Sequence, residues 1–196
     1  MAYIELAMLK KALGVTDTDR DALLEQAISA ASSGIDERCG RTFGRDLVPS
    51  TRTFRTRGRT LRNDLGGELL LVDDIATDEG LVIEVGGRDT WAEVHATRYE
   101  TEPENALAKG RPVTSLALLY SWWSLWRSVR ITAVWGWPAV PAGVEQAALL
   151  QASRLYRRKD SPEGVAGSAE WGLVRVPSLD PDVRALVEPF RLVGFG

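Results

Sequence analysis

Five arginines fall within eleven residues of one segment. Guanidinium groups bind carboxylates and phosphates through paired hydrogen bonds. Alternate residues of an extended strand share a face, so we expect Arg55, Arg57 and Arg59 to form a row. That row can pair with carboxylates of a neighbouring copy, in a head-to-tail contact that closes into a ring, or it can face DNA in a channel. We favour the contact between copies.

The middle of the chain supplies the carboxylates for such a contact. Residues 64–104 contain twelve Asp or Glu and two Lys or Arg, a net charge of -10, whereas residues 1–63 carry +3 and residues 105–196 carry +4. Phosphate binding needs concentrated Lys and Arg, so this segment is poorly suited to nucleic acid. Its simplest interpretation is a solvated acidic face. The predicted inter-subunit residues are Arg52, Arg55, Arg57, Arg59, Asp73 and Asp74.

A second basic group ends the long apolar-periodic segment near residue 158. Cations at the C-terminal end of a helix interact favourably with the helix dipole, which is a sufficient structural role for them. The group is also our candidate for lining a channel that DNA passes through. It consists of Arg154, Arg157, Arg158 and Lys159.

Five of the seven tryptophans lie within sixteen residues. Indole rings can stack on nucleic acid bases, but basic residues are sparse among these tryptophans, so we predict burial against a sheet or a neighbouring subunit. The five are Trp122, Trp123, Trp126, Trp135 and Trp137.

The residues typical of catalysis or metal binding are few. Cys39 is the only cysteine and His95 the only histidine, which excludes a disulfide framework and a Cys/His metal cluster within one chain. We expect Cys39 to be a buried apolar residue and His95 an ordinary strand residue. No glycine-rich phosphate loop is present, and adjacent carboxylates such as Asp73 and Asp74 point to opposite faces of a strand. We therefore predict no enzyme activity, no cofactor and no metal.

The composition indicates one folded domain. The 196 residues are 44% hydrophobic and 26% charged, which is close to the average of soluble globular proteins. No apolar run approaches the roughly 20 residues that span a bilayer, and the N-terminal residues do not resemble a signal peptide. We expect a cytosolic protein that does not enter a membrane.

Helices are predicted at both ends of the chain. Apolar spacing favours a short helix over residues 3–13, which ends at Gly14, and a longer one from a capping box at Thr18 and Asp21 to Gly40. A third helix begins at Pro141 and includes the second basic group. After a possible short strand at residues 171–176, Asp180 should cap a last helix over residues 181–188.

The intervening residues 50–137 contain short β-prone runs separated by Gly, Asp and Asn. This pattern favours an antiparallel sheet or sandwich of five or six strands. The apolar tail after the last helix can dock on the core of its own chain or on a partner.

Three stretches together carry a resemblance to a known family. They are LKKALGVTDTDRDALLEQAISAASSGIDERCGRTFG near the N-terminus, VRITAVWGWPAVPAGVEQAALLQASRLYRRKDSPEGVAG, and WGLVRVPSLDPDVRALVEPFR. The chain resembles the head-to-tail adaptor (connector) proteins of long-tailed double-stranded DNA bacteriophages and related prophage elements. The likeness covers the N-terminal 45 residues and about the last 65.

The resemblance implies a structural subunit of the virion neck, built in the host cytoplasm. Its copies would form a ring, usually a dodecamer, beneath the portal protein, extend the DNA channel and offer a platform for a stopper or tail-completion protein. The implied fold is α+β, with a helical bundle made from residues 1–48 and 139–196 and an inserted β-region at residues 49–138. The implied portal contacts are Phe190, Leu192, Val193 and Phe195.

Two other functions remain open. One is another ring of the phage neck, such as a stopper or tail terminator, although helices at both chain ends argue against it. The other is a DNA-binding module that uses the arginines from Arg52 to Arg62.

Overall fold

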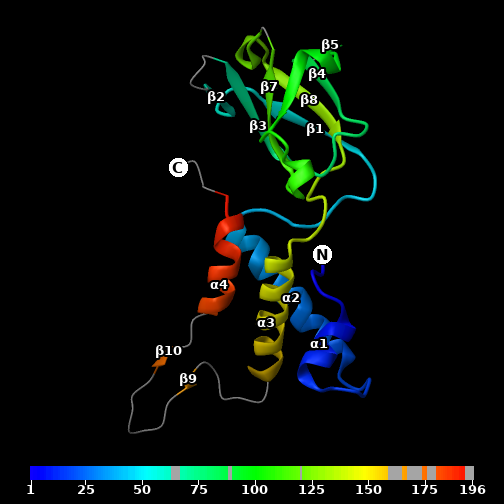
Figure 1. Ribbon diagram of the computed structural model, residues 1–196, viewed down its shortest axis with the longest axis vertical. Coiled ribbons are helices and arrows are strands. Elements are labelled where there is room, and N and C mark those ends of the chain that lie inside the picture. Colours follow the sequence, from blue (N-terminus) through cyan, green and yellow to red (C-terminus); the bar gives the residue numbers. More distant parts are fainter. Residues whose placement is uncertain are drawn as a thin grey trace. The chain divides into compact units, whose positions relative to one another are not determined.

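The computed structural model describes residues 1–62, 67–87, 90–119, 121–158 and 180–192, and the backbone at 165–166 and 174–175. Its helices and its antiparallel sheets occupy different parts of the chain, so the predicted α+β class is confirmed (Figure 1). The chain divides into two compact units. The helical unit comprises Met1–Phe43 and Val140–Gly196, and the β unit comprises Gly44–Ala139.

Left-handed glycines end the first two helices of the helical unit. Helix α1 spans Leu6–Leu13 and α2 spans Asp21–Cys39, and the glycines that follow, Gly14 and Gly40, have φ of 69° and 66° as the sequence predicts. The predicted capping box before α2 is wrong. No side chain caps this helix, because Asp21 pairs instead with Lys10 of α1 at 2.6 Å.

Two C-terminal helices complete the helical unit. Helix α3 spans Ala142–Arg158 and packs on α2, while α4 spans Pro181–Val187 and packs on α3. Helix α1 contacts both α2 and α3. Small side chains on the two central helices let their backbones approach closely. The fully buried alanines are Ala31, Ala147, Ala148 and Ala152.

The start of α4 agrees with the sequence prediction. The Asp180 carboxylate caps it by accepting a hydrogen bond from the Asp182 amide at 2.9 Å. Before α4, the two-residue strands β9 (Val165–Ala166) and β10 (Val174–Arg175) pair antiparallel. The predicted strand at residues 171–176 contains β10, and its other residues lie outside the described part of the chain.

The β unit contains two four-stranded antiparallel sheets, in the orders β1-β8-β4-β5 and β2-β3-β7-β6. The prediction of five or six strands is therefore wrong, because several strands are too short to show alternation in the sequence. The strands are β1 Ser50–Arg55, β2 Thr60–Arg62, β3 Glu68–Ile75, β4 Val82–Gly87, β5 Thr90–Glu93, β6 Tyr99–Glu102, β7 Val113–Leu118 and β8 Ser128–Ala133. Short 3₁₀ turns η1 (Ala96–Arg98), η2 (Leu107–Lys109) and η3 (Trp123–Leu125) connect some of them, and a fourth, η4 (Glu188–Phe190), follows α4.

Both sheets contribute to a single apolar core. Ile83 and Ile131 come from the first sheet and Leu70 and Leu116 from the second, and all four are fully buried. Trp123 is also fully buried in this core, and its ring nitrogen donates a hydrogen bond to the Leu116 carbonyl at 2.7 Å. Burial of this indole agrees with the structural role predicted for the tryptophans.

Backbone hydrogen bonds join the first and last residues of the β unit. The Trp137 amide donates to the Gly44 carbonyl at 3.2 Å, and the Asp46 amide donates to the Trp135 carbonyl at 2.8 Å. Between these tryptophans, Gly136 has φ of 108°, and a Cβ there would lie 1.8 Å from the Gly44 oxygen. Only glycine fits this close approach of two backbones.

We predict that Gly136→Ala destabilises the protein by about 2 to 4 kcal/mol, because the methyl group must push the two backbones apart. Urea denaturation measures the loss. The matched control is Gly34→Ala in α2, where a Cβ meets nothing within 4 Å. It should stabilise the protein by up to about 1 kcal/mol. Equal effects of the two substitutions would contradict this account of Gly136.

Candidate assembly surface

The arginine row does not form one strand. Strand β1 ends at Arg55, and a turn follows in which the Arg59 amide donates to the Thr56 carbonyl at 3.0 Å and Gly58 has φ of 82°. The prediction that alternation along one strand places Arg55, Arg57 and Arg59 on one face is therefore wrong. A turn that contains the left-handed Gly58 separates β1 from β2.

Two of these arginines pair with a carboxylate of their own chain. Arg52 lies 2.9 Å from Asp73 and 3.7 Å from Asp46, and Arg59 lies 3.6 Å from Asp73. Both guanidinium groups also lie over aromatic rings, Arg52 over Trp135 at 4.3 Å and Arg59 over Phe54 at 5.0 Å. These contacts hold Arg52 and Arg59 against the β unit.

The other two predicted arginines are exposed. No ion pair of Arg55 or Arg57 occurs among the residues that the structure describes. Asp74, by contrast, accepts a hydrogen bond from the Trp137 ring nitrogen at 2.9 Å. Of the residues predicted to act between copies, Arg52, Arg59, Asp73 and Asp74 therefore have partners within the chain. Arg55 and Arg57 present exposed charges.

Exposed apolar side chains lie on strand β2 and in and around the turn η3. Leu61, Trp122, Leu125 and Trp126 have exposed fractions of 41%, 46%, 69% and 39%. Arg62 lies over the Trp122 ring at 5.5 Å. Large apolar side chains this exposed, with arginine among them, are typical of protein interfaces. The tryptophan cluster thus divides into three buried members and two exposed ones.

Hydrogen bonds attach the turn η3 and the residue that follows it to the β unit. Glu68 at the start of β3 accepts from the amide and the hydroxyl of Ser124, each at 2.8 Å. The Thr56 hydroxyl donates to the Trp126 carbonyl at 2.6 Å. These hydrogen bonds hold the turn η3 beside the edge of the sheet β2-β3-β7-β6 at which β2 lies.

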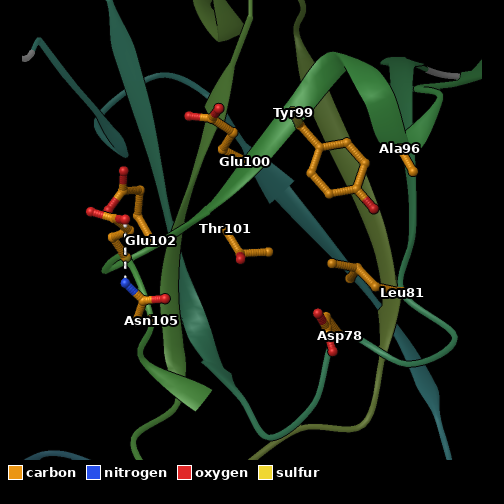
Figure 2. Close-up of a pocket in the computed structure, with 9 residues that line it drawn as sticks. Asp78, Leu81, Ala96, Tyr99, Glu100, Thr101, Glu102 and Asn105 are labelled. Carbon is orange, nitrogen blue, oxygen red and sulfur yellow. Dashed lines mark hydrogen bonds between the residues drawn. The ribbon is translucent and has the colours of Figure 1, made fainter. Parts of the chain in front are cut away.

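An acidic hollow of about 610 Å³ lies at strand β6, and Figure 2 shows Glu100 and Glu102 on one side of this strand and Thr101 and Asp78 on the other. Tyr99 forms part of its wall. Burial raises the pKa of this tyrosine, with smaller contributions from the negative charges of Asp78 and Glu93. Within the described residues, no three His, Cys, Asp or Glu side chains are grouped so that they could hold a metal ion. The complete lining is Asp78, Leu81, Ala96, Tyr99, Glu100, Thr101, Glu102, Glu104 and Asn105.

One ion pair in the β unit was not predicted from the sequence. Arg130 of β8 donates to both carboxylate oxygens of Glu84 on β4, at 2.8 and 2.6 Å, and lies over the Trp91 ring at 4.6 Å. The two residues face each other directly across the strand pair. The hydrogen bonds from Arg130 lower the pKa of Glu84. Only the strand register brings the two charges together, so the sequence alone gives no signal of it.

His95 also differs from its prediction. It lies after β5, outside any strand, and its ring Nδ1 accepts a hydrogen bond from the Thr97 amide at 3.3 Å. This contact starts the turn η1. The histidine therefore has a local structural role.

The basic group at the end of α3 is partly engaged. Arg154 pairs with Asp180 at 3.1 Å, which ties the end of α3 to the start of α4. Arg157 is exposed and Arg158 is half-buried. Lys159 lies outside the described residues. Of the three predicted DNA-channel residues that the structure describes, Arg157 is the exposed one.

The described part of the C-terminal tail docks on its own helical unit. The Phe190 ring meets the buried Phe43 ring edge-on at 5.8 Å, and Phe43 meets Tyr3 in the same way. The Leu192 amide donates to the Cys39 carbonyl at 2.9 Å, while the Leu192 side chain is 45% exposed. Val193 and Phe195 lie outside the described residues. Of the four predicted portal contacts, Leu192 presents an exposed apolar side chain.

Buried polar groups hold the region beneath this tail. The Tyr3 hydroxyl donates to Asp36 and accepts from the Phe43 amide at 2.9 Å. Burial, followed by the hydrogen bond to Asp36, raises the pKa of Tyr3 far above its ordinary value. Cys39 is fully buried, as the sequence predicts, and this burial raises the pKa of its thiol.

Comparison with known proteins gives one family and one fold. Residues 3–102, just over half of the chain, match the family model of the phage gp6-like head-tail connector protein. This span takes in α1, α2 and the β unit as far as β6. No curated protein matches the sequence.

Two solved structures share the fold. One is a chain from the neck of an empty gene transfer agent particle, computed with C6 symmetry, with 20% identity and a TM-score of 0.53. The other is a chain from the virion of the native particle, with 21% identity and the same TM-score. In each case the match covers 98% of this chain and 91% of the other.

None of the helices within the described residues has the length and apolar character needed to cross a bilayer.

The Arg130–Glu84 pair predicts a specific dependence on pH. Because the folded-state pKa of Glu84 is lowered, its contribution to stability is present above the unfolded-state pKa and is lost as the pH falls through the folded-state pKa. Arg130→Gln should raise the pKa of Glu84, measured by NMR titration of its carboxyl carbon. The stability difference between wild type and variant should shrink toward acid pH. Arg127→Gln is the control, and an equal rise of the Glu84 pKa in that variant would contradict the assignment.

Proposed function

Because the chain belongs to the phage gp6-like head-tail connector family, we propose that it is a structural subunit of the neck of a phage-like particle. The family match over residues 3–102 is the observation that carries this proposal. The shared fold of chains from the neck and virion of a gene transfer agent supports it. The subunit acts by binding other proteins, and it catalyses no reaction.

The connector assembles into a ring beneath the portal and leaves a central passage for double-stranded DNA. Helices α1 to α4, from both ends of the chain, form the helical bundle of each subunit. The packing of α2 on α3 and of α3 on α4 supports this assignment. A dodecamer is the stoichiometry that the sequence resemblance implies. The ring then offers a platform for a stopper or tail-completion protein.

Arg157 and Arg158, with Lys159 beyond them, face the passing DNA in this proposal. Their charges contact phosphates without reading base sequence. Arg154 has a different role, since its pair with Asp180 ties α3 to α4.

The C-terminal tail makes the contact with the portal. Leu192 is the contact residue favoured by its exposed side chain, and Val193 and Phe195 extend the apolar segment beyond it. Phe190 anchors the tail through its edge contact with Phe43. In this proposal Phe190 binds the core of its own chain, and Leu192 binds the partner.

We predict that Leu192→Asp abolishes binding to the portal protein, because a charge replaces the exposed apolar group while the Leu192 amide keeps its hydrogen bond to Cys39. The mass of the complex formed by purified connector and portal measures binding. Leu23→Asp on α2 is the matched control, with 47% exposure against 45%. If Leu192→Asp bound the portal as wild type does, this contact would be excluded. A wild-type chain that never bound the portal would contradict the proposed neck function.

A DNA-binding module is the second candidate function, and the exposed Arg55, Arg57 and Arg62 favour it. Salt titration of binding to a duplex separates the two functions. For the connector we expect weak binding whose salt dependence corresponds to few phosphates, on the order of two or three per subunit. Arg157→Glu should weaken this binding uniformly across sequences. A steep salt dependence, abolished by Arg55→Glu and Arg57→Glu, would favour the DNA-binding module instead.

A further inference from the structure

The sheet β2-β3-β7-β6 carries contrasting side chains at its two edges. At one edge, which we name the arginine edge, Arg57 and Arg62 lie beside an apolar group. At the other, the acidic edge, four carboxylates are among the residues that line the hollow at β6. The apolar group is Leu61, Trp122, Leu125 and Trp126, and the carboxylates are Asp78, Glu100, Glu102 and Glu104.

Neither edge has its charges neutralised within the chain. Among the described residues, no ion pair involves Arg57, Arg62 or any carboxylate of the acidic edge. Lys109 donates a hydrogen bond from its Nζ to the backbone carbonyl of Glu104, one of the lining residues, at 3.5 Å. Arg98 also precedes β6, in η1. The carboxylates outnumber these two cations.

We propose that the arginine edge of one copy binds the acidic edge of the next copy in the ring. The proposal rests on the ring assembly proposed above and names the surface that joins its subunits. Since β2 and β6 are the two outermost strands of one sheet, their side chains cannot meet within a chain. They can meet only between copies, and one copy offers both halves of the contact.

The strand directions suit such a repeat. Neighbouring strands in this sheet are all antiparallel, so β6 runs opposite to β2. A second copy in the same orientation therefore places its β2 antiparallel to the β6 that it faces. Strands β2 and β6 contain only three and four residues. Because short edge strands offer little backbone for pairing, side chains make the contact.

The charges also decide the symmetry of the contact. A two-fold dimer through either edge would place arginines against arginines or carboxylates against carboxylates, which is repulsive. A head-to-tail contact places opposite charges together and leaves one free edge at each end, so the chain of copies grows until it closes. Trp122 and Trp126 bring apolar area to this contact, and the hollow of about 610 Å³ has room for an arginine or aromatic side chain.

Charge reversal on the full-length chain tests the proposal, with association followed by sedimentation over a range of concentrations. Arg57→Glu with Arg62→Glu, and separately Glu100→Arg with Glu102→Arg, should each weaken association of copies by about tenfold or more. Arg57→Lys with Arg62→Lys is the matched control, which should associate as wild type does. Circular dichroism confirms that each variant is folded.

A mixture of the two reversed variants provides the decisive measurement. Each alone sets like charges against each other, but in a 1:1 mixture every contact between unlike copies regains opposite charges, so association should recover to near the wild-type level. One chain carrying all four reversals should recover as well. Loss of association without recovery in either case would overturn the proposal, because it would mean that the substitutions act through the fold.

Three other outcomes are informative. Wild-type chains that stayed monomeric at every concentration, or that associated unchanged when the edges were reversed, would overturn the proposed contact. An edge variant that lost only its binding to another neck protein would assign the edge to that partner and would also overturn it. Portal binding is measured on the same samples. Failure of this contact with portal binding intact leaves the neck function standing, whereas loss of portal binding by the wild-type chain would count against the function itself.

Discussion

The packing of α2 against α3 is the contact on which the rest of the chain depends, because it joins segments separated by the whole β unit. Helix α2 ends at Cys39 and α3 begins at Ala142. The buried faces of the two helices combine large side chains such as Leu24 and Ile28 with alanines such as Ala31 and Ala148. The two ends of the β unit, which connects α2 to α3, must therefore lie close together. The hydrogen bond between Trp137 and Gly44 meets that requirement, and the glycine at position 136 makes it possible.

The distribution of charge in the β unit separates internal contacts from external ones. Asp73 and Glu84 hold arginines of their own chain, and each of those arginines also covers an aromatic ring. These charges stabilise the surface of the sandwich and are not available to a partner. Among the residues that the structure describes, no ion pair involves the carboxylates that line the β6 hollow. An acidic segment that appears uniform in the sequence therefore contains carboxylates that are paired within the chain and carboxylates that form no ion pair among the described residues.

Much of the fold followed from local signals. Gly14, Gly40 and Asp180 mark helix ends because their effects depend only on neighbouring residues. The pairing of Arg130 with Glu84 did not follow, since it depends on the register of strands that are distant in sequence. The strand count failed because β2 has three residues and shows no alternation. For the candidate site, the sequence identified the group of arginines. Only the structure shows that Arg59 forms an ion pair with Asp73, whereas no ion pair of Arg57 occurs among the described residues.

The long separation of α2 from α3 has a consequence for synthesis on the ribosome. Helix α2 emerges roughly a hundred residues before α3, which at 5–20 residues per second is a delay of about 5 to 20 seconds. During that time the apolar face formed by Leu24, Ile28 and Ile35 has no α3 to cover it. The β unit, complete at Ala139, emerges before α3 and can fold first. The contact between α2 and α3 therefore forms only after the β unit between them has been synthesised.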